Sequence, residues 1–220
     1  MSGVVRLLQL ASPALPIGGY SYSSGLESAI ECSEVSDPES AFNWIDDALS
    51  LVVGRFDAPL VAAAMQACEA GDQFRIDELN RLALAARETA ELRLESEQMG
   101  YSLMQWIEQV PGRAPEAAPA LPVAAAVAWA IAAWRLRLGA GEAVTGFLWS
   151  FAENQVMVLI KTIPLGQIQA QRVLHRLGPR IEAVAAAALQ LPAEEWSNAA
   201  PGLAIASMVH EIQYSRLFRS

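Results

Sequence analysis

The feature that most constrains this fold is the concentration of good helix formers into long segments with almost no strand-type sequence. Threonine occurs only at Thr89, Thr145 and Thr162, while alanine, leucine, glutamate and arginine fill the segments between prolines and glycines. These residues favour helices. No segment shows the alternation of apolar and polar residues that marks a half-buried strand. The sequence therefore predicts an all-α protein.

Capping and helix-breaking residues divide this sequence into segments. Ser24-x-x-Glu27 and Ser36-x-x-Glu39 have the spacing of capping boxes, in which the glutamate reaches back to the serine amide. Gly54 is a predicted helix stop. The expected helices cover residues 22–32, 38–54, 58–70, 72–107 with a break near Arg87, 123–138, 142–160, 165–189 and 201–217.

The composition favours a single core. Of the 220 residues, 53% are hydrophobic and 18% are charged, which leaves apolar surface of the kind that partner proteins cover. Residues 111–122 hold four prolines and predict a connection within the domain, because the flanking segments are both strongly apolar. We expect one domain over residues 1–220, an all-α bundle of roughly eight to ten helices.

Charge and cysteine usage indicate a cytoplasmic protein. A net charge of -9 would repel nucleic acid and anionic lipid alike, so we expect neither nucleic acid nor membrane as a partner. The first residues do not resemble a signal peptide. Cys32 and Cys68 lack the spacing of a zinc site or a disulfide framework, and we expect two free buried thiols.

The motifs of common catalytic sites are incomplete. Lys161 is the only lysine, and no glycine-rich phosphate loop precedes it. Ser21 lacks the following glycine of a nucleophile elbow. His210-Glu211 begins like a zinc-protease helix but has no second histidine one turn later. The sequence thus predicts no catalytic residues, no metal site and no directly bound cofactor.

Three segments have unusual composition, and each permits two interpretations. The loop before Glu27 carries closely spaced prolines, glycines and tyrosines; it is either held for a purpose or simply closes the bundle. Lys161 either contacts a partner or extends from the end of a buried helix, where the helix dipole also favours a cation. Residues 210–220 combine arginine with aromatic residues, as interface anchors do, or fold back on their own core.

Together these segments resemble the urease accessory protein F (UreF) family. The matching blocks, in family order, are residues 8–27, 57–59, 86–89, 91–93, 161–167, 210–211 and 215–220. The resemblance implies an all-helical protein that is not an enzyme and that assists nickel insertion into apo-urease. It also implies a bridge between accessory protein D, also called H, and the GTPase G, with a homodimer in the complex that docks on apo-urease. Nickel would be handled by the complex, and GTP would be bound by protein G.

The resemblance also assigns site residues. It places Glu27, Asp57 and Lys161 on the surface that faces the GTPase, and we expect Lys161 to control GTPase turnover. It makes the last residues the segment that orders on binding protein D, namely Tyr214, Arg216, Leu217, Phe218, Arg219 and Ser220.

Two other classes of function remain as alternatives. A helical enzyme assembled from distant residues would show carboxylates with perturbed pKa values around Gly18 and Gly19. A self-contained ligand-binding or regulatory domain would show an enclosed apolar pocket.

Overall fold

Alanine-rich helices form the buried centre of the protein. In α7 (Ala125–Arg135), every residue from Ala126 to Ala133 is buried. This helix packs against α4 (Ala58–Ala70) and α6 (Ala90–Gln109). Gly100 of α6 permits the closest approach, since a Cβ there would lie 1.9 Å from the carbonyl oxygen of Val123. Small side chains therefore let helices pack around α7 on all sides.

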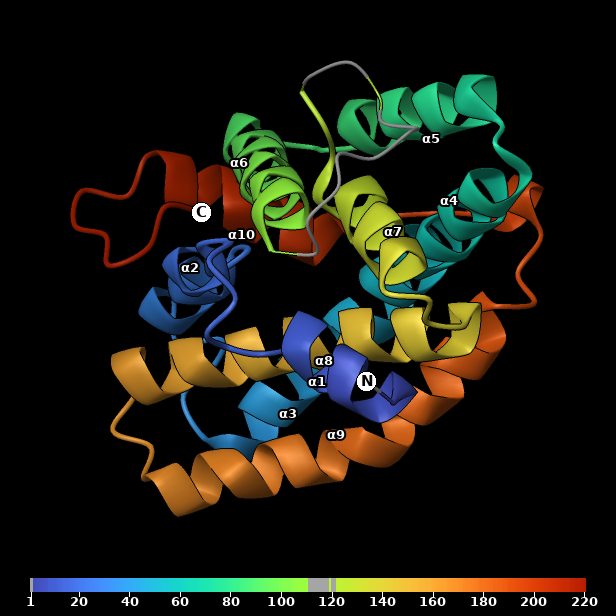
Figure 1. Cartoon of the computed structure of the whole chain (residues 1–220). Coiled ribbons are helices and arrows are strands. Elements are labelled where there is room, and N and C mark those ends of the chain that lie inside the picture. The colour runs from blue at the N-terminus through green and yellow to red at the C-terminus, as the bar shows by residue number, and fades with distance from the viewer. Residues whose placement is uncertain (1, 111–118, 120–121) are drawn as a thin grey trace.

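The computed structural model describes residues 2–110, 119 and 122–220, and all regular elements in those residues are helical. In Figure 1, α8 (Ala140–Thr162) lies side by side with α9 (Gln167–Ala188), while α2 (Leu26–Glu31) lies at one end of the molecule near α10 (Pro201–Glu211). The other elements are α1 (Gly3–Leu10), α3 (Pro38–Asp47), α5 (Gln73–Ala85) and the single turns η1 (Gly19–Ser21) and η3 (Ala193–Glu195). The prediction of an all-α, single-domain bundle is confirmed.

The predicted helix stop at Gly54 is wrong. Residues Pro38–Ala70 form one continuous helix, in which the π-helical segment η2 (Ala48–Asp57) joins α3 to α4. A Cβ at position 54 would lie 2.3 Å from Val184 Cγ1 and 2.5 Å from the Leu49 carbonyl oxygen. The glycine thus permits close packing on α9 within the helix. The π-helical turns end shortly before Pro59, which has no N–H to give to a regular helix.

Both predicted capping boxes are also wrong. The helix α2 begins only at Leu26, because Ser24 and Gly25 have positive φ angles of 52° and 87°. The cap of α3 is Asp37, whose carboxylate accepts hydrogen bonds from the amides of Glu39 and Ser40. A carboxylate one residue nearer to the helix therefore displaces serine as the cap.

Of the remaining helix boundaries, the predicted end of the last helix at residue 217 is wrong, whereas the others agree more closely with expectation. The predicted break near Arg87 is confirmed, since α5 ends at Ala85 and α6 begins at Ala90. The last helix ends at Glu211 rather than at residue 217, and the tail after it is not helical. The proline-rich connection falls outside the described residues except at Pro119 and Pro122.

Two helices are long and apolar enough to cross a membrane by length and composition alone. Their most apolar windows are 78% buried inside the protein in Pro38–Ala70 and 50% buried in Ala140–Thr162. Such burial is typical of core helices. Both cysteines are free, but only Cys68 is buried, where desolvation raises its thiol pKa to about 11. Cys32 is exposed, contrary to expectation.

Candidate partner-binding sites

After α10, the tail (residues 212–220) loops outward and returns alongside α2 (Figure 1). Its last residues bind backbone to backbone with the loop before α2. The Arg219 amide donates to the Ser21 carbonyl at 2.8 Å, and the Ser23 amide donates to the Ser220 carbonyl at 2.9 Å. The tail therefore has a defined path over its own chain.

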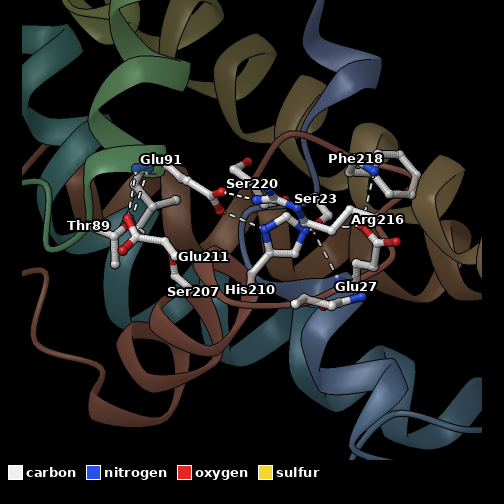
Figure 2. A network of polar contacts seen from close by, with 12 residues as sticks. Ser23, Glu27, Thr89, Glu91, Ser207, His210, Glu211, Arg216, Phe218 and Ser220 are labelled. Atoms are coloured by element: carbon white, nitrogen blue, oxygen red, sulfur yellow. Dashed lines mark hydrogen bonds and ion pairs between the residues drawn. The ribbon is translucent and has the colours of Figure 1, made fainter.

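Glu27 holds the middle of the tail. Its buried carboxylate accepts hydrogen bonds from the Leu217 amide at 2.7 Å and the Phe218 amide at 3.0 Å. One of its oxygens also lies 3.1 Å from His210 Nε2 (Figure 2). These contacts occupy the carboxylate that the capping-box prediction directed toward Ser24. They also explain why the tail is not helical, since its amides bind a side chain instead of helix carbonyls.

His210 joins this carboxylate to a second one. Its side chain is 0% exposed, and Nδ1 lies 2.6 Å from Glu91 Oε2. The other Glu91 oxygen pairs with the guanidinium of Arg216 in the tail. We call Glu27, Glu91, His210 and Arg216 the tail cluster. Reasoning from sequence found neither the role of Glu91 nor that of His210, although both lie in the family-matching blocks.

The end of the tail is buried. Ser220 is 0% exposed, and its hydroxyl donates to Glu95 Oε2 at 2.6 Å. Ser24 also donates to Glu95, at 3.1 Å. Burial raises the pKa of the Glu95 carboxyl, an effect that these two hydroxyl hydrogen bonds oppose.

Lys161 lies in the last turn of α8 and also contacts the tail. Its Nζ donates to the Tyr20 carbonyl at 3.3 Å and lies 5.2 Å from the centre of the Phe218 ring. The lysine is exposed, whereas Phe218 is buried. The structure therefore brings Lys161 and Glu27 together at Phe218: the lysine lies near its ring and the glutamate binds its amide.

Asp57 does not join the other two predicted GTPase-facing residues. Its buried carboxylate forms an ion pair with Arg87, in the connection between α5 and α6. Burial disfavours the charge on Arg87, but Asp57, with smaller contributions from Glu95 and Glu88, outweighs it and raises the pKa of the guanidinium. Asp57 is thus inside the protein in this structure.

A cavity of about 170 Å³ lies beside this ion pair. Trp129, Phe147 and Phe151 are among its mostly apolar lining residues, and Gly19 and Tyr20 also line it. The lining includes three carboxyls whose pKa values are raised by burial, those of Glu88, Glu95 and Glu153. The cavity combines a mostly apolar lining with carboxyls of raised pKa, but it is partly open rather than enclosed. Among the described residues, no group of three or more His, Cys, Asp or Glu side chains is arranged to hold a metal ion.

Apolar side chains are exposed along α10 and the tail. Tyr214 is fully exposed, and Ile212 and Leu217 are 84% and 72% exposed. On α10, Ile205 and Met208 are also exposed. The tail cluster thus holds the backbone of a segment whose apolar side chains stay accessible to a partner.

The comparisons with known proteins agree with the resemblance seen in the sequence. A family model described as UreF matches residues 35–178. The urease accessory protein UreF of Azoarcus sp. (strain BH72) is 48% identical, with 99% of this chain and 95% of that protein covered. The protein of the same name from Pseudomonas aeruginosa (strain LESB58) is 50% identical over the full length of both chains. That from Ectopseudomonas mendocina (strain ymp) is 49% identical, with 97% of each chain covered.

Proposed function

The chain belongs to the UreF family of urease accessory proteins, and we propose that it acts in the cytoplasm as a bridging subunit during nickel insertion into apo-urease. It is an accessory protein and not a catalytic enzyme. In this proposal it contacts accessory protein D, also called H, and the GTPase G, and forms a homodimer within their complex. GTP is bound by protein G, and nickel is handled by the complex.

One observation carries this proposal: the tail is held in place while its apolar side chains point away from the protein. Ile212, Tyr214 and Leu217 are exposed beside the tail cluster, which suits a surface for protein D. Holding the backbone in advance lowers the entropy cost of binding. Phe218 and Ser220 support this surface from inside, because both are buried.

Lys161 and Glu27 lie at the same end of the molecule, and we place the contact with protein G around Lys161. Lys161 is exposed and is the only lysine of the chain. It presents a compact cation for acidic groups of a partner. Replacing Lys161 with alanine should alter the GTP hydrolysis rate of the complex. An unchanged rate with normal urease activation would contradict this role.

The experiment for the whole proposal is the nickel content of urease produced with its other accessory proteins. Nickel occupancy should collapse without this chain and recover when the chain is supplied. A chain that ends at Gln213 should not restore it and should not co-purify with protein D. The matched control is Tyr101→Ala, which removes an exposed aromatic side chain from α6 at a position far along the helix from Glu91. This variant should restore nickel occupancy. Equal occupancy with and without the chain would overturn the proposal.

The cavity supports a second candidate function, that of a ligand-binding or regulatory domain. Its walls are mostly apolar, and the buried oxygens Ser150 Oγ and Asn154 Oδ1, on lining residues, have no hydrogen-bond partner among the described residues. A ligand that donates hydrogen bonds would satisfy both oxygens. Thermal unfolding with a library of small amphipathic compounds tests this candidate. It predicts a raised melting temperature that disappears in Phe147→Ala.

A further inference from the structure

Both ring nitrogens of His210 face carboxylate oxygens. Nδ1 lies 2.6 Å from Glu91, and Nε2 lies 3.1 Å from Glu27. A neutral imidazole has a hydrogen on one nitrogen only and a lone pair on the other. With a neutral ring, one of these contacts would set a lone pair of the fully buried ring against a carboxylate oxygen. An imidazolium donates a hydrogen bond to both.

The charges around His210 lead to the same conclusion. The groups that face it are Glu27 from α2, Glu91 from α6 and, through Glu91, Arg216 from the tail. When the ring of His210 is an imidazolium, it and Arg216 carry two positive charges. These balance the two negative charges of the carboxylates. A neutral ring would leave one more negative than positive charge around a fully buried side chain, which is unfavourable. Glu211, next to His210, accepts a hydrogen bond from the Glu91 amide and is exposed.

The position of His210 in its helix adds a third argument. It lies in the last turn of α10, where the helix dipole favours a cation. The tail starts directly after this turn, and its Arg216, Leu217 and Phe218 all bind the two carboxylates that the ring connects. The ring therefore connects the end of α10 to the two groups that hold the tail.

We propose that His210 is the positioning residue of the tail: its imidazolium joins Glu27 to Glu91, and loss of its proton releases the tail. Raising the pH then moves the chain from a state with a docked tail to one with a free tail. This inference deepens the proposed function, on which it rests only for the identity of the partner. If protein D binds the docked tail, its affinity falls as the pH rises.

The first test uses the full chain without a partner. Nitrogen-15 NMR of the imidazole rings, recorded between pH 5.5 and 9, reports the protonation of both histidines. The exposed His175 of α9 serves as the internal reference. We expect both nitrogens of His210 to stay protonated wherever the Leu217 and Phe218 amide signals show a docked tail. The amide shifts should change in step with loss of the ring proton. A docked tail beside a neutral His210 ring would overturn the inference.

The second test uses a variant that changes the pH dependence of tail docking. If His210 only filled space, this variant would not change that dependence. In Glu91→Gln, the side-chain amide can donate to the lone pair of a neutral ring, so tail docking should no longer depend on pH. In His210→Gln, docking should be weaker at every pH and also independent of it. His175→Gln is the matched control and should titrate like the unaltered chain. A Glu91→Gln chain that retains the pH dependence of the tail would refute the role of the imidazolium.

The third test separates this inference from the proposed function. The affinity of the full chain for protein D should fall at least tenfold between pH 6 and pH 8.5, and Glu91→Gln should abolish that change. If the tail responds to pH in the NMR test but the affinity for protein D does not, the inference about His210 stands. The assignment of the docked tail to protein D is then the part that fails.

Discussion

The tail cluster and the Asp57–Arg87 pair both bury charged groups, but they hold very different parts of the protein. The cluster fixes a terminal segment that exposes Tyr214 and Leu217 to solvent. The pair joins the π-helical segment η2 to the residues between α5 and α6. It also lines the cavity described above. Breaking the first should therefore free a segment locally, whereas breaking the second should affect the whole fold. The same kind of interaction has a local or a global effect according to what it connects.

The largest expected effect is that of Asp57→Ala. It leaves the guanidinium of Arg87 buried without its partner, and breaking a buried pair in this way costs about 3–5 kcal/mol of unfolding free energy. Urea denaturation of the isolated chain measures the loss. Removing Arg87 as well should recover part of it.

The control for Asp57→Ala is Glu39→Ala, which breaks the exposed ion pair with Arg176. This variant should unfold close to the unaltered chain, because exposed pairs add little. If Asp57→Ala were as stable as this control, the contrast between the two charged regions would be lost.

Glu27→Gln should have the next largest effect, confined to the tail. The amide removes the negative charge that three donors share, and the docked tail should lose about 1–3 kcal/mol. Hydrogen exchange of the Leu217 and Phe218 amides should speed up, while the urea midpoint of the whole chain changes little. Glu31→Gln, an exposed position on the same helix, is the matched control. A large drop in the urea midpoint would show that the tail is part of the global folding unit.

Glu95 lies between the two regions, because it binds Ser220 and also lines the cavity. Burial raises its pKa above the ordinary value for glutamate, so the folded chain holds this proton more tightly than the unfolded chain. Its contribution to stability is thus greatest at acid pH and declines as the pH rises through the raised pKa. Glu95→Gln lacks this term, so its stability relative to the unaltered chain should increase with pH. Urea unfolding of both chains from pH 4 to pH 8 measures the difference; a constant difference would contradict the expectation.

The smallest effect should come from Lys161→Met. This variant keeps an apolar side chain near Phe218 but removes the cation above the ring, which is worth about 0.5–1 kcal/mol at an exposed site. Exchange of the Phe218 amide should speed up less than in Glu27→Gln, and Lys161→Arg should retain most of the protection. A faster exchange in Lys161→Met than in Glu27→Gln would reverse the ranking of the two contacts.

Sequence reasoning succeeded where local preferences decide the structure. The break near Arg87 and the helices around residues 142–160 and 165–189 follow from propensity and helix-breaking residues. It was wrong at Gly54. In the sequence, a glycine that permits close contact with Val184 cannot be distinguished from a glycine that ends a helix. It was wrong at residues 212–217, because their amides bind Glu27 instead of continuing the helix.

The candidate site was predicted only in part. Glu27, Lys161 and Phe218 were singled out by the family resemblance, and the structure brings them together. The role of His210 was missed, since a lone histidine without a second metal ligand carries no signal in sequence. Its meaning depends on Glu27 and Glu91, which are 183 and 119 residues away along the chain.

By itself, the sequence determined that this chain is helical, that it lacks the common catalytic motifs and that it resembles the UreF family. Those properties depend on residue type and short spacing, which the chain carries whether folded or not. Only the tertiary structure decided that Glu27 and Asp57 serve different regions and that His210 lies between two carboxylates. Contacts of this kind depend on how helices that are distant in sequence pack together. Burial then makes a charged group without its partner energetically unfavourable.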